Sequence, residues 1–152
     1  MTDILYCGND KVFDGVLTSS LSIVRRLDAP RPLTIHIFTM ELTRVSPDYL
    51  PMTRRHADIM VCKDIGLLYD LDVEAVEYAA ARDHYGKYLI NPNYINAGVL
   101  LFNMKLCRET GIFEKARALI RTKKLMFADQ SALIRSTTSR RLLPQRFNDQ
   151  KF

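Results

Sequence analysis

The residues best suited to chemistry surround a short apolar run, residues 99–102, near the middle of the chain. Asn93 and Asn96 precede this run, and Gly98 lies where the expected strand begins. An unbroken apolar run predicts a strand buried on both faces, as in a parallel sheet. A glycine at its entry predicts a close approach to the backbone or a positive φ. Amides at the mouth of such a strand could hydrogen-bond to a polyhydroxyl ligand. The alternative is an ordinary loop in which the asparagines make turns.

A second candidate position is the turn Gly8-Asn9-Asp10, which follows the first apolar segment. The elements expected around it are a strand over residues 4–7, an amphipathic helix over 15–27 and a strand over 33–39. In such a βαβ unit the turn lies at the carboxyl end of the first strand, where open parallel sheets bind ligands. The turn lacks the Gly-x-Gly-x-x-Gly spacing, so the sequence does not support a dinucleotide cofactor.

The helices that position these residues have recognisable faces and caps. The helix over 15–27 is expected to bury one apolar stripe, made of Leu17, Leu21 and Val24 with Val16, Ile23 and Leu27 alongside. Three polar residues are expected to cap helices, because their side chains can accept hydrogen bonds from helix N–H groups. Asp14 is expected to cap this helix, Asn103 a helix over 105–109 and Asp129 a helix over 130–135.

The other segments complete an α/β pattern. They are a strand-like segment over 56–62, a helical turn over 67–70, a loop over 83–95, a helix over 112–120 that follows the break at Gly111, and a final strand or extended tail over 141–147. Helix propensity favours a helix over 73–82 because of its alanines and glutamates.

Composition indicates one globular domain of 152 residues, with 47% apolar and 26% charged residues. No apolar run approaches the roughly 20 residues that span a bilayer, and the N-terminus has no signal-peptide pattern. The three cysteines, Cys7, Cys62 and Cys107, lack metal-like spacing. Reduced thiols in the cytoplasm fit this usage best.

The charge is unevenly distributed along the chain. Residues 1–104 hold 10 basic and 13 acidic side chains, a balance of −3, whereas residues 105–152 hold 12 and 4, a balance of +8. A basic segment favours a phosphate-bearing ligand, nucleic acid or an anionic membrane surface. The alternative is a solvated basic face, and no aromatic-interleaved motif supports specific nucleic-acid binding.

Several pieces of the chain, in this order, resemble family 8 of the glycosyltransferases, which includes glycogenin and bacterial lipopolysaccharide galactosyl- and glucosyltransferases. The pieces are residues 4–10, residues 56–69, Asn-Ala-Gly-Val-Leu-Leu-Phe-Asn at 96–103, and Asp-Gln within 127–133, continuing to 146–148. The resemblance implies an α/β fold of the Rossmann-like nucleotide-diphospho-sugar transferase kind (GT-A type). That fold is an abbreviated, mostly parallel sheet flanked by helices, with a strand over 73–82.

The resemblance also implies the chemistry. Members of the family are retaining hexosyltransferases that use a nucleotide sugar, commonly UDP-linked, and a divalent metal, usually Mn²⁺, which acts as a Lewis acid on the leaving diphosphate. The implied partners are the nucleotide sugar and a saccharide or lipid-linked saccharide acceptor, as in lipopolysaccharide biosynthesis. Peripheral membrane contact through basic residues 105–152 is a further expectation, and the oligomeric state is left open.

Carried over residue by residue, the resemblance gives each part of the site a candidate. The resemblance implies that Cys7, Gly8, Asn9 and Asp10 contact the nucleotide. His56, Ala57 and Asp58 occupy the Asp-x-Asp metal motif, with His56 and Asp58 as ligands. Asn96 and Ala97 are implied to hold the donor sugar, and Asp129 and Gln130 to lie beside the reacting sugar carbon.

The chain departs from the family pattern in three places. His56 stands where the motif has a carboxylate, and a neutral imidazole suits Mn²⁺ less well. Only a loop separates Thr39 from His56, and the family's C-terminal His-x-x-Gly-x-x-Lys-Pro-Trp segment is not found. We therefore expect a shortened single domain over 1–152. Two alternatives to an active hexosyltransferase stay open: an inactive remnant that binds sugar nucleotides weakly, and a basic module that binds nucleic acid or anionic surfaces.

Overall fold

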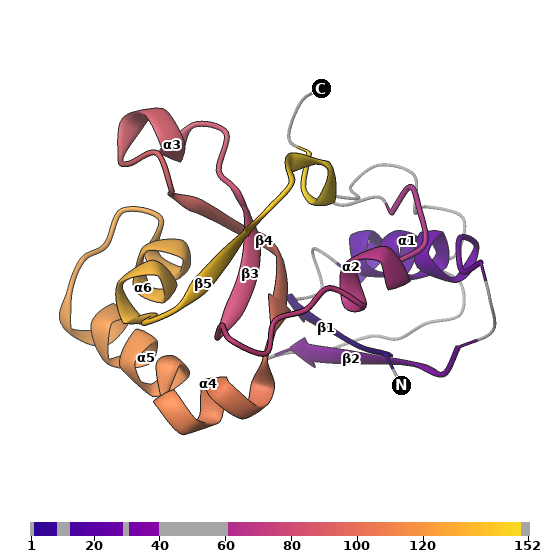
Figure 1. Ribbon diagram of the computed structural model, residues 1–152, viewed down its shortest axis with the longest axis horizontal. Helices are drawn as coiled ribbons and strands as arrows, with labels where there is room; N and C mark the ends of the chain where they lie inside the picture. Colours follow the sequence, from indigo (N-terminus) through magenta and orange to yellow (C-terminus); the bar gives the residue numbers. More distant parts are fainter. Residues whose placement is uncertain (1, 9–12, 29–30, 40–60, 150–152) are drawn as a thin grey trace. The chain divides into compact units, whose positions relative to one another are not determined.

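The computed structural model describes residues 2–8, 13–28, 31–39 and 61–149 (Figure 1). The chain forms two compact units, Met1–Asp70 and Leu71–Phe152. The prediction of a single domain over 1–152 stays a prediction. Within the described residues, no helix is long and apolar enough to cross a membrane.

The first unit contains the expected βαβ pattern. Strand β1 (Thr2–Gly8) is followed by helix α1 (Phe13–Val24) and strand β2 (Leu33–Thr39). The two strands pair in parallel along their whole length, from Thr2 opposite Leu33 to Gly8 opposite Thr39. The carboxyl end of β1 therefore leads into the turn that the sequence singled out, although Asn9 and Asp10 lie outside the described residues.

The predicted face of α1 is correct in part, and its predicted start is wrong. The helix begins at Phe13, so Asp14 lies within it and is not its N-cap. Val16 and Ile23 are buried as expected, but Leu21 and Val24 are exposed, and the buried side chains include Ser19. The reason is a polar contact, because the Tyr6 hydroxyl on β1 donates to Ser19 Oγ at 2.8 Å. A search for apolar periodicity alone cannot find a helix face that packs through a serine.

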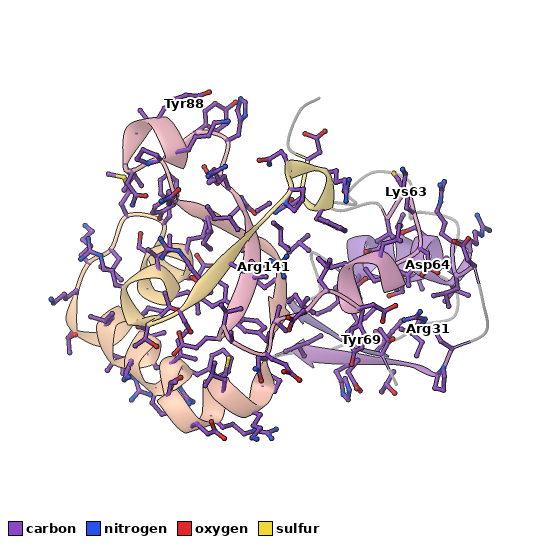
Figure 2. The ribbon with its side chains drawn as sticks, in the orientation of Figure 1. Arg31, Lys63, Asp64, Tyr69, Tyr88 and Arg141 are labelled. Atoms are coloured by element: carbon purple, nitrogen blue, oxygen red, sulfur yellow. The ribbon has the colours of Figure 1, made fainter. Side chains whose placement is uncertain are left out.

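A short helix, α2 (Gly66–Tyr69), ends the first unit and matches the predicted helical turn. The Asp64 carboxylate accepts from Gly66 N at 2.8 Å and from Asp28 N at 3.1 Å, and these two hydrogen bonds lower the pKa of Asp64. Arg31 donates to both carboxylate oxygens of Asp70 at 3.2 Å. Figure 2 labels Arg31 and Asp64, which fasten α2 to the segment before β2.

The second unit is built on a three-stranded sheet in the order β4-β3-β5. Strand β3 (Tyr78–Arg82) pairs antiparallel with β4 (Ile95–Phe102) and parallel with β5 (Arg140–Leu143). The other elements of the unit are helices α3 (Gly86–Leu89), α4 (Met104–Thr110), α5 (Ile112–Thr122) and α6 (Ala128–Ser136) and the 3-10 turn η3 (Gln145–Phe147). In Figure 1, α3 projects from the connection between β3 and β4.

Burial explains why 73–82 yields a strand and not the helix that propensity favours. Tyr78, Ala79, Ala80 and Ala81 are all fully buried at the centre of the sheet, and tertiary packing of this kind overrides helix propensity. The core around them collects side chains from sheet and helices: Tyr78, Ala80, Ile95, Cys107, Ile112 and Leu133. The resemblance therefore predicted the type of this element correctly, but the strand begins at Tyr78 and not at residue 73.

Two expectations about the neighbouring segments are wrong. Strand β4 pairs antiparallel rather than parallel, and among its residues only Ile95 is buried. The side chains of β4 after Ile95 are partly buried or exposed, so its two faces are not both covered. The predicted loop over 83–95 contains α3.

The helix ends were predicted with mixed success. Asn103 caps α4 as expected, because its side chain accepts from Leu106 N at 3.1 Å, and Gly111 ends that helix with φ of 65°. Asp129 is not the cap of α6. Phe127, with a left-handed φ of 51°, occupies the cap position, and Asp129 lies in the first turn.

Candidate functional site

A polar cluster lies at one edge of the sheet of the second unit, where three chain segments meet. Antiparallel pairing places Arg82, at the end of β3, opposite Ile95, at the start of β4. Parallel pairing places the end of β5 beside the end of β3. The residues that follow β3, begin β4 and follow β5 are therefore gathered at this edge, which we call the polar edge. It holds the side chains of Asp83, Asn96 and Asn148, joined by Gln130 from α6.

Asn96 is the centre of the polar edge. Its Nδ2 donates to Asp83 Oδ2 at 2.9 Å. Its Oδ1 accepts from Gly98 N at 2.7 Å and from Asn148 Nδ2 at 2.8 Å. The carboxamide is thus fixed in one orientation by partners on three segments, as a residue that positions a ligand must be.

The close approach predicted at Gly98 is confirmed. A Cβ atom added to Gly98 would lie 2.8 Å from Asn96 Oδ1, so any side chain there would displace the amide that Gly98 N holds. The alternative, a positive φ, does not apply: in the described part of the chain such values occur only at Gly111 and Phe127.

Asp83 is a site residue that the sequence analysis missed. Its Oδ1 accepts from Gly86 N at 2.6 Å and Tyr85 N at 3.0 Å, while Oδ2 faces Asn96. Burial by itself raises the pKa of Asp83, but the hydrogen bonds to its carboxylate outweigh burial and hold that pKa below its ordinary value; their donors are Asn96, Gly86, Tyr85 and Gln130. The available signal was the Asp-x-x-Gly spacing directly after a predicted strand.

Gln130 joins α6 to the polar edge. Its Oε1 accepts from Ala97 N at 3.1 Å, so the predicted sugar contacts Asn96 and Ala97 and the predicted catalytic residue Gln130 do lie together. Asp129 precedes Gln130 in the first turn of α6 and is exposed. The position of α6 is fixed by a buried hydrogen bond of 2.7 Å between Tyr94 Oη and Ser131 Oγ.

The segment after β5 is tied down by Gln145. Its Nε2 donates to Arg82 O at 3.2 Å and to Asn148 O at 2.8 Å. These bonds hold η3 against the end of β3 and allow Asn148 to reach Asn96. Asn148 was quoted only as part of a matching piece, and no role was predicted for it.

The predicted nucleotide and metal residues are mostly beyond what the structure describes. Asn9, Asp10, His56, Ala57 and Asp58 lie outside the described residues. Cys7 and Gly8 end β1, opposite Phe38 and Thr39 of β2. Among the residues that are described, no three His, Cys, Asp or Glu side chains come together as metal ligands. The described residues thus do not provide a Mn²⁺ site, and His56 with Asp58 stays a prediction.

The arrangement at the polar edge suits the binding of hydroxyl groups. It offers a carboxylate and carboxamides, which can accept and donate several directed hydrogen bonds, and hydrogen bonds to a charged carboxylate are about twice as strong as neutral ones. Since the low pKa keeps Asp83 ionised near neutral pH, its chemistry there is hydrogen-bond acceptance and charge stabilisation rather than proton transfer.

Comparison with known proteins identifies the fold. No protein-family model matches the chain, and no curated protein matches it significantly. Solved structures do match. The glycosyltransferase GlyE of Streptococcus pneumoniae TIGR4 superposes with a TM-score of 0.74 over 97% of this chain, at 18% identity. The chain has the GT-A fold of glycosyltransferases.

Two further structures support this fold. The bifunctional glycosyltransferase WbbM gives a TM-score of 0.71 at 17% identity over 95% of this chain, and an active-site mutant of LgtC gives 0.73 at 14% identity over 95%. The chain spans less than half the length of GlyE (46%) and of WbbM (39%), and 74% of the length of LgtC.

Proposed function

We propose that this chain is a retaining glycosyltransferase of family 8 type, which transfers a hexose from a nucleotide sugar, commonly UDP-linked, to a saccharide acceptor. The observation that carries the proposal is the hydrogen-bonded set of Asp83, Asn96 and Gln130 at one edge of a GT-A sheet. It joins the Asn-Ala-Gly and Asp-Gln motifs, which are 33 residues apart between Ala97 and Gln130.

In this proposal each residue of the polar edge has a defined task. Asp83 accepts hydrogen bonds from hydroxyls of the donor sugar, because it stays ionised and its Oδ2 has capacity beyond the bond from Asn96. Asn96 orients Asp83. Gln130 fixes the backbone at Ala97 and, with Asp129, lies beside the reacting carbon. None of these tasks requires a proton to be moved by the polar edge itself.

The named neighbours support sugar transfer as the general activity. One LgtC structure is a galactosyltransferase in complex with donor and acceptor sugar analogues. The LgtC mutant has glutamate in place of an active-site glutamine, and Gln130 is the glutamine that this chain places at its candidate site. WbbM is a bifunctional glycosyltransferase.

The metal belongs to the proposal as well. His56 and Asp58 would hold Mn²⁺, which when bound neutralises charge on the diphosphate of the donor. An imidazole contributes no negative charge, so binding is expected to be weaker than with two carboxylates. Replacing His56→Asp should tighten Mn²⁺ binding, as measured by calorimetry without any sugar nucleotide. No gain would speak for the inactive alternative.

The direct test is release of UDP from UDP-glucose and UDP-galactose by the purified chain with Mn²⁺. Wild type should release UDP, and Asn96→Ala should release about tenfold less or lower still, the loss of one well-placed hydrogen bond to a charged group. Asn91→Ala, an exposed asparagine in the same unit, is the matched control. A folded wild-type protein that turns over neither donor contradicts the proposal.

A further inference from the structure

The second unit carries a cluster of exposed apolar side chains on α3 and on the turn between α5 and α6. Its members include four of the most exposed large hydrophobic residues of the described chain, at 78% for Tyr88, 76% for Leu89 and 70% for Tyr85 and Met126. We call it the tip surface and define it as Tyr85, Tyr88, Leu89, Ile90, Met126 and Phe127. An exposed apolar patch of this kind marks an interaction site.

Two contacts show that the two segments of the tip surface lie next to each other. The ring of Tyr94 packs directly on the backbone of Gly86 in α3, since a Cβ atom there would lie 2.3 Å from Tyr94 Cδ1. The same ring lies 6.2 Å from the ring of Phe127, between centroids. One buried tyrosine therefore joins both exposed segments. Figure 2 shows Tyr88 at the outer end of this region, pointing away from the sheet of the unit.

The charged side chains within the two segments that carry the tip surface are basic, and Asp83, Glu114 and Asp129 border these segments. Residues 84–94 and 115–128 contain six lysines and arginines and no aspartate or glutamate. Lys87 Nζ lies 4.8 Å from the centroid of the Tyr88 ring, and Lys123 and Lys124 precede Met126. The apolar side chains are thus flanked by exposed cations. That combination fits a partner that is apolar beneath a negatively charged surface.

We propose that the tip surface docks on the surface of an anionic lipid bilayer. Tyrosines and aliphatic side chains at its tip enter the interface, where amphipathic rings are favoured. The flanking lysines contact anionic headgroups. A second copy of the chain fits less well, because pairing two such surfaces opposes like charges. A protein partner fits less well because lysine is depleted at protein interfaces.

The position of the tip surface gives this docking a consequence for the substrate. Asp83 immediately precedes the first of its two segments and Asp129 immediately follows the second, so the polar edge borders the surface. Resting on the proposed function, the acceptor would be a glycan carried on a lipid anchor, which the bilayer presents beside the donor sugar. This binding differs from the contact predicted through the whole basic segment 105–152, because α3 carries its apolar part.

The test is sedimentation of the full chain with vesicles of phosphatidylcholine alone and with an equal mixture of phosphatidylcholine and phosphatidylglycerol. Wild type should bind the mixed vesicles and bind them less at high salt. Tyr88→Ser with Leu89→Ser should weaken binding about tenfold or more, since binding scales with the buried apolar area. The matched control, Leu67→Ser with Met104→Ser, removes two exposed apolar residues elsewhere and should bind like wild type.

A second pair of variants tests the charge. Lys123→Gln with Lys124→Gln should weaken binding to the mixed vesicles about tenfold, whereas Lys105→Gln with Arg108→Gln on α4 should change it less. Absence of vesicle binding, or equal binding by the Tyr88/Leu89 variant, overturns the proposal. Self-association in size-exclusion chromatography that the same variant abolishes also overturns it, in favour of a contact between copies.

The two proposals fail separately. Vesicle binding without UDP release from either donor would leave the bilayer contact in place and remove the enzyme. If both are present, the Tyr88/Leu89 variant should release UDP in the absence of acceptor as wild type does, because neither residue touches the polar edge.

Discussion

Two carboxylates stand at the two ends of the same strand, and their surroundings differ. Glu77 directly precedes β3 and is completely buried, and Asp83 directly follows β3 and is only partly buried. Both have a lowered pKa, because in each case hydrogen bonds to the carboxylate outweigh its burial. Both carboxylates are thus stabilised in the ionised form by hydrogen bonds, but they differ in their burial.

The difference lies in what remains for a ligand. Burial by itself raises the pKa of Glu77, but hydroxyl and backbone donors lower it to about 2; the donors come from Thr137, Thr110, Thr138 and Ser139. All of them belong to the fold, and water cannot reach the carboxylate. The partners of Asp83 include the motif residues Asn96 and Gln130, and Asp83 is only partly buried. We infer that Glu77 stabilises the unit and that Asp83 is available for binding.

The largest expected effect is the loss of stability in Glu77→Gln. The new amide group would face donors such as Thr138 N, which lies 2.9 Å from the carboxylate, so buried donors lose their acceptor. We expect a loss of about 3 kcal/mol in the free energy of unfolding, measured by urea denaturation. Glu74→Gln, at an exposed position in the same segment, should change it by less than about 0.5 kcal/mol. Equal stabilities would show that Glu77 is not a structural anchor.

The pH dependence of stability should carry the same signature. Hydrogen bonds in the folded chain hold the pKa of Glu77 at about 2, against its ordinary value of 4.5, so its contribution to stability is complete above pH 4.5. It is lost as pH falls from there towards 2. The melting temperature of wild type should therefore fall steeply as pH decreases over this range, and that of Glu77→Gln should fall less. Identical slopes for the two proteins would contradict the account.

At the other end of the strand, Asp83→Asn should affect binding more than folding. An amide in place of the carboxylate can set its own N–H₂ group against the N–H₂ group of Asn96, so that two donors face each other. Solvent can compensate at this partly exposed site. We expect a loss of about 1 kcal/mol in stability and a decrease of 10- to 100-fold in donor turnover, measured by urea denaturation and UDP release. The reverse ranking, a stability loss equal to that of Glu77→Gln with unchanged turnover, would make the two carboxylates alike.

A smaller effect is expected from Gly98→Ala. The added Cβ would lie 2.8 Å from Asn96 Oδ1 and must shift that amide by a few tenths of an ångström. Donor turnover should fall about fivefold, while the melting temperature should stay close to that of wild type. The exposed position of Gly98 supports this split. A variant with full turnover would show that the orientation of Asn96 does not matter.

Much of the local structure could be predicted from the sequence. The strand-helix-strand start, the β4 segment, the cap at Asn103 and the break at Gly111 all follow from short-range patterns. The α1 face and the α6 cap could not, because the first depends on a hydroxyl of β1 and the second on the left-handed conformation of Phe127.

Some residues of the polar edge could be predicted from the sequence and others could not. Asn96, Ala97 and Gln130 were found through a resemblance, and the structure brings Ala97 and Gln130 into contact. Asp83 was missed because it belongs to none of the matching motifs. It meets Asn96 through the antiparallel pairing of β3 with β4, whereas a mostly parallel sheet was predicted. Because the antiparallel direction of β4 was not predicted, the contact between Asp83 and Asn96 could not be predicted either.

The central claim is that the polar edge binds the sugar of a nucleotide sugar, and the most direct measurement is a pair of calorimetric titrations. UDP-galactose and UDP are titrated separately, with Mn²⁺ present, into wild type and into Asp83→Asn. The account predicts that wild type binds UDP-galactose more tightly than UDP, and that this difference disappears in Asp83→Asn while affinity for UDP is unchanged. An equal difference in both proteins, or no difference in wild type, would contradict it.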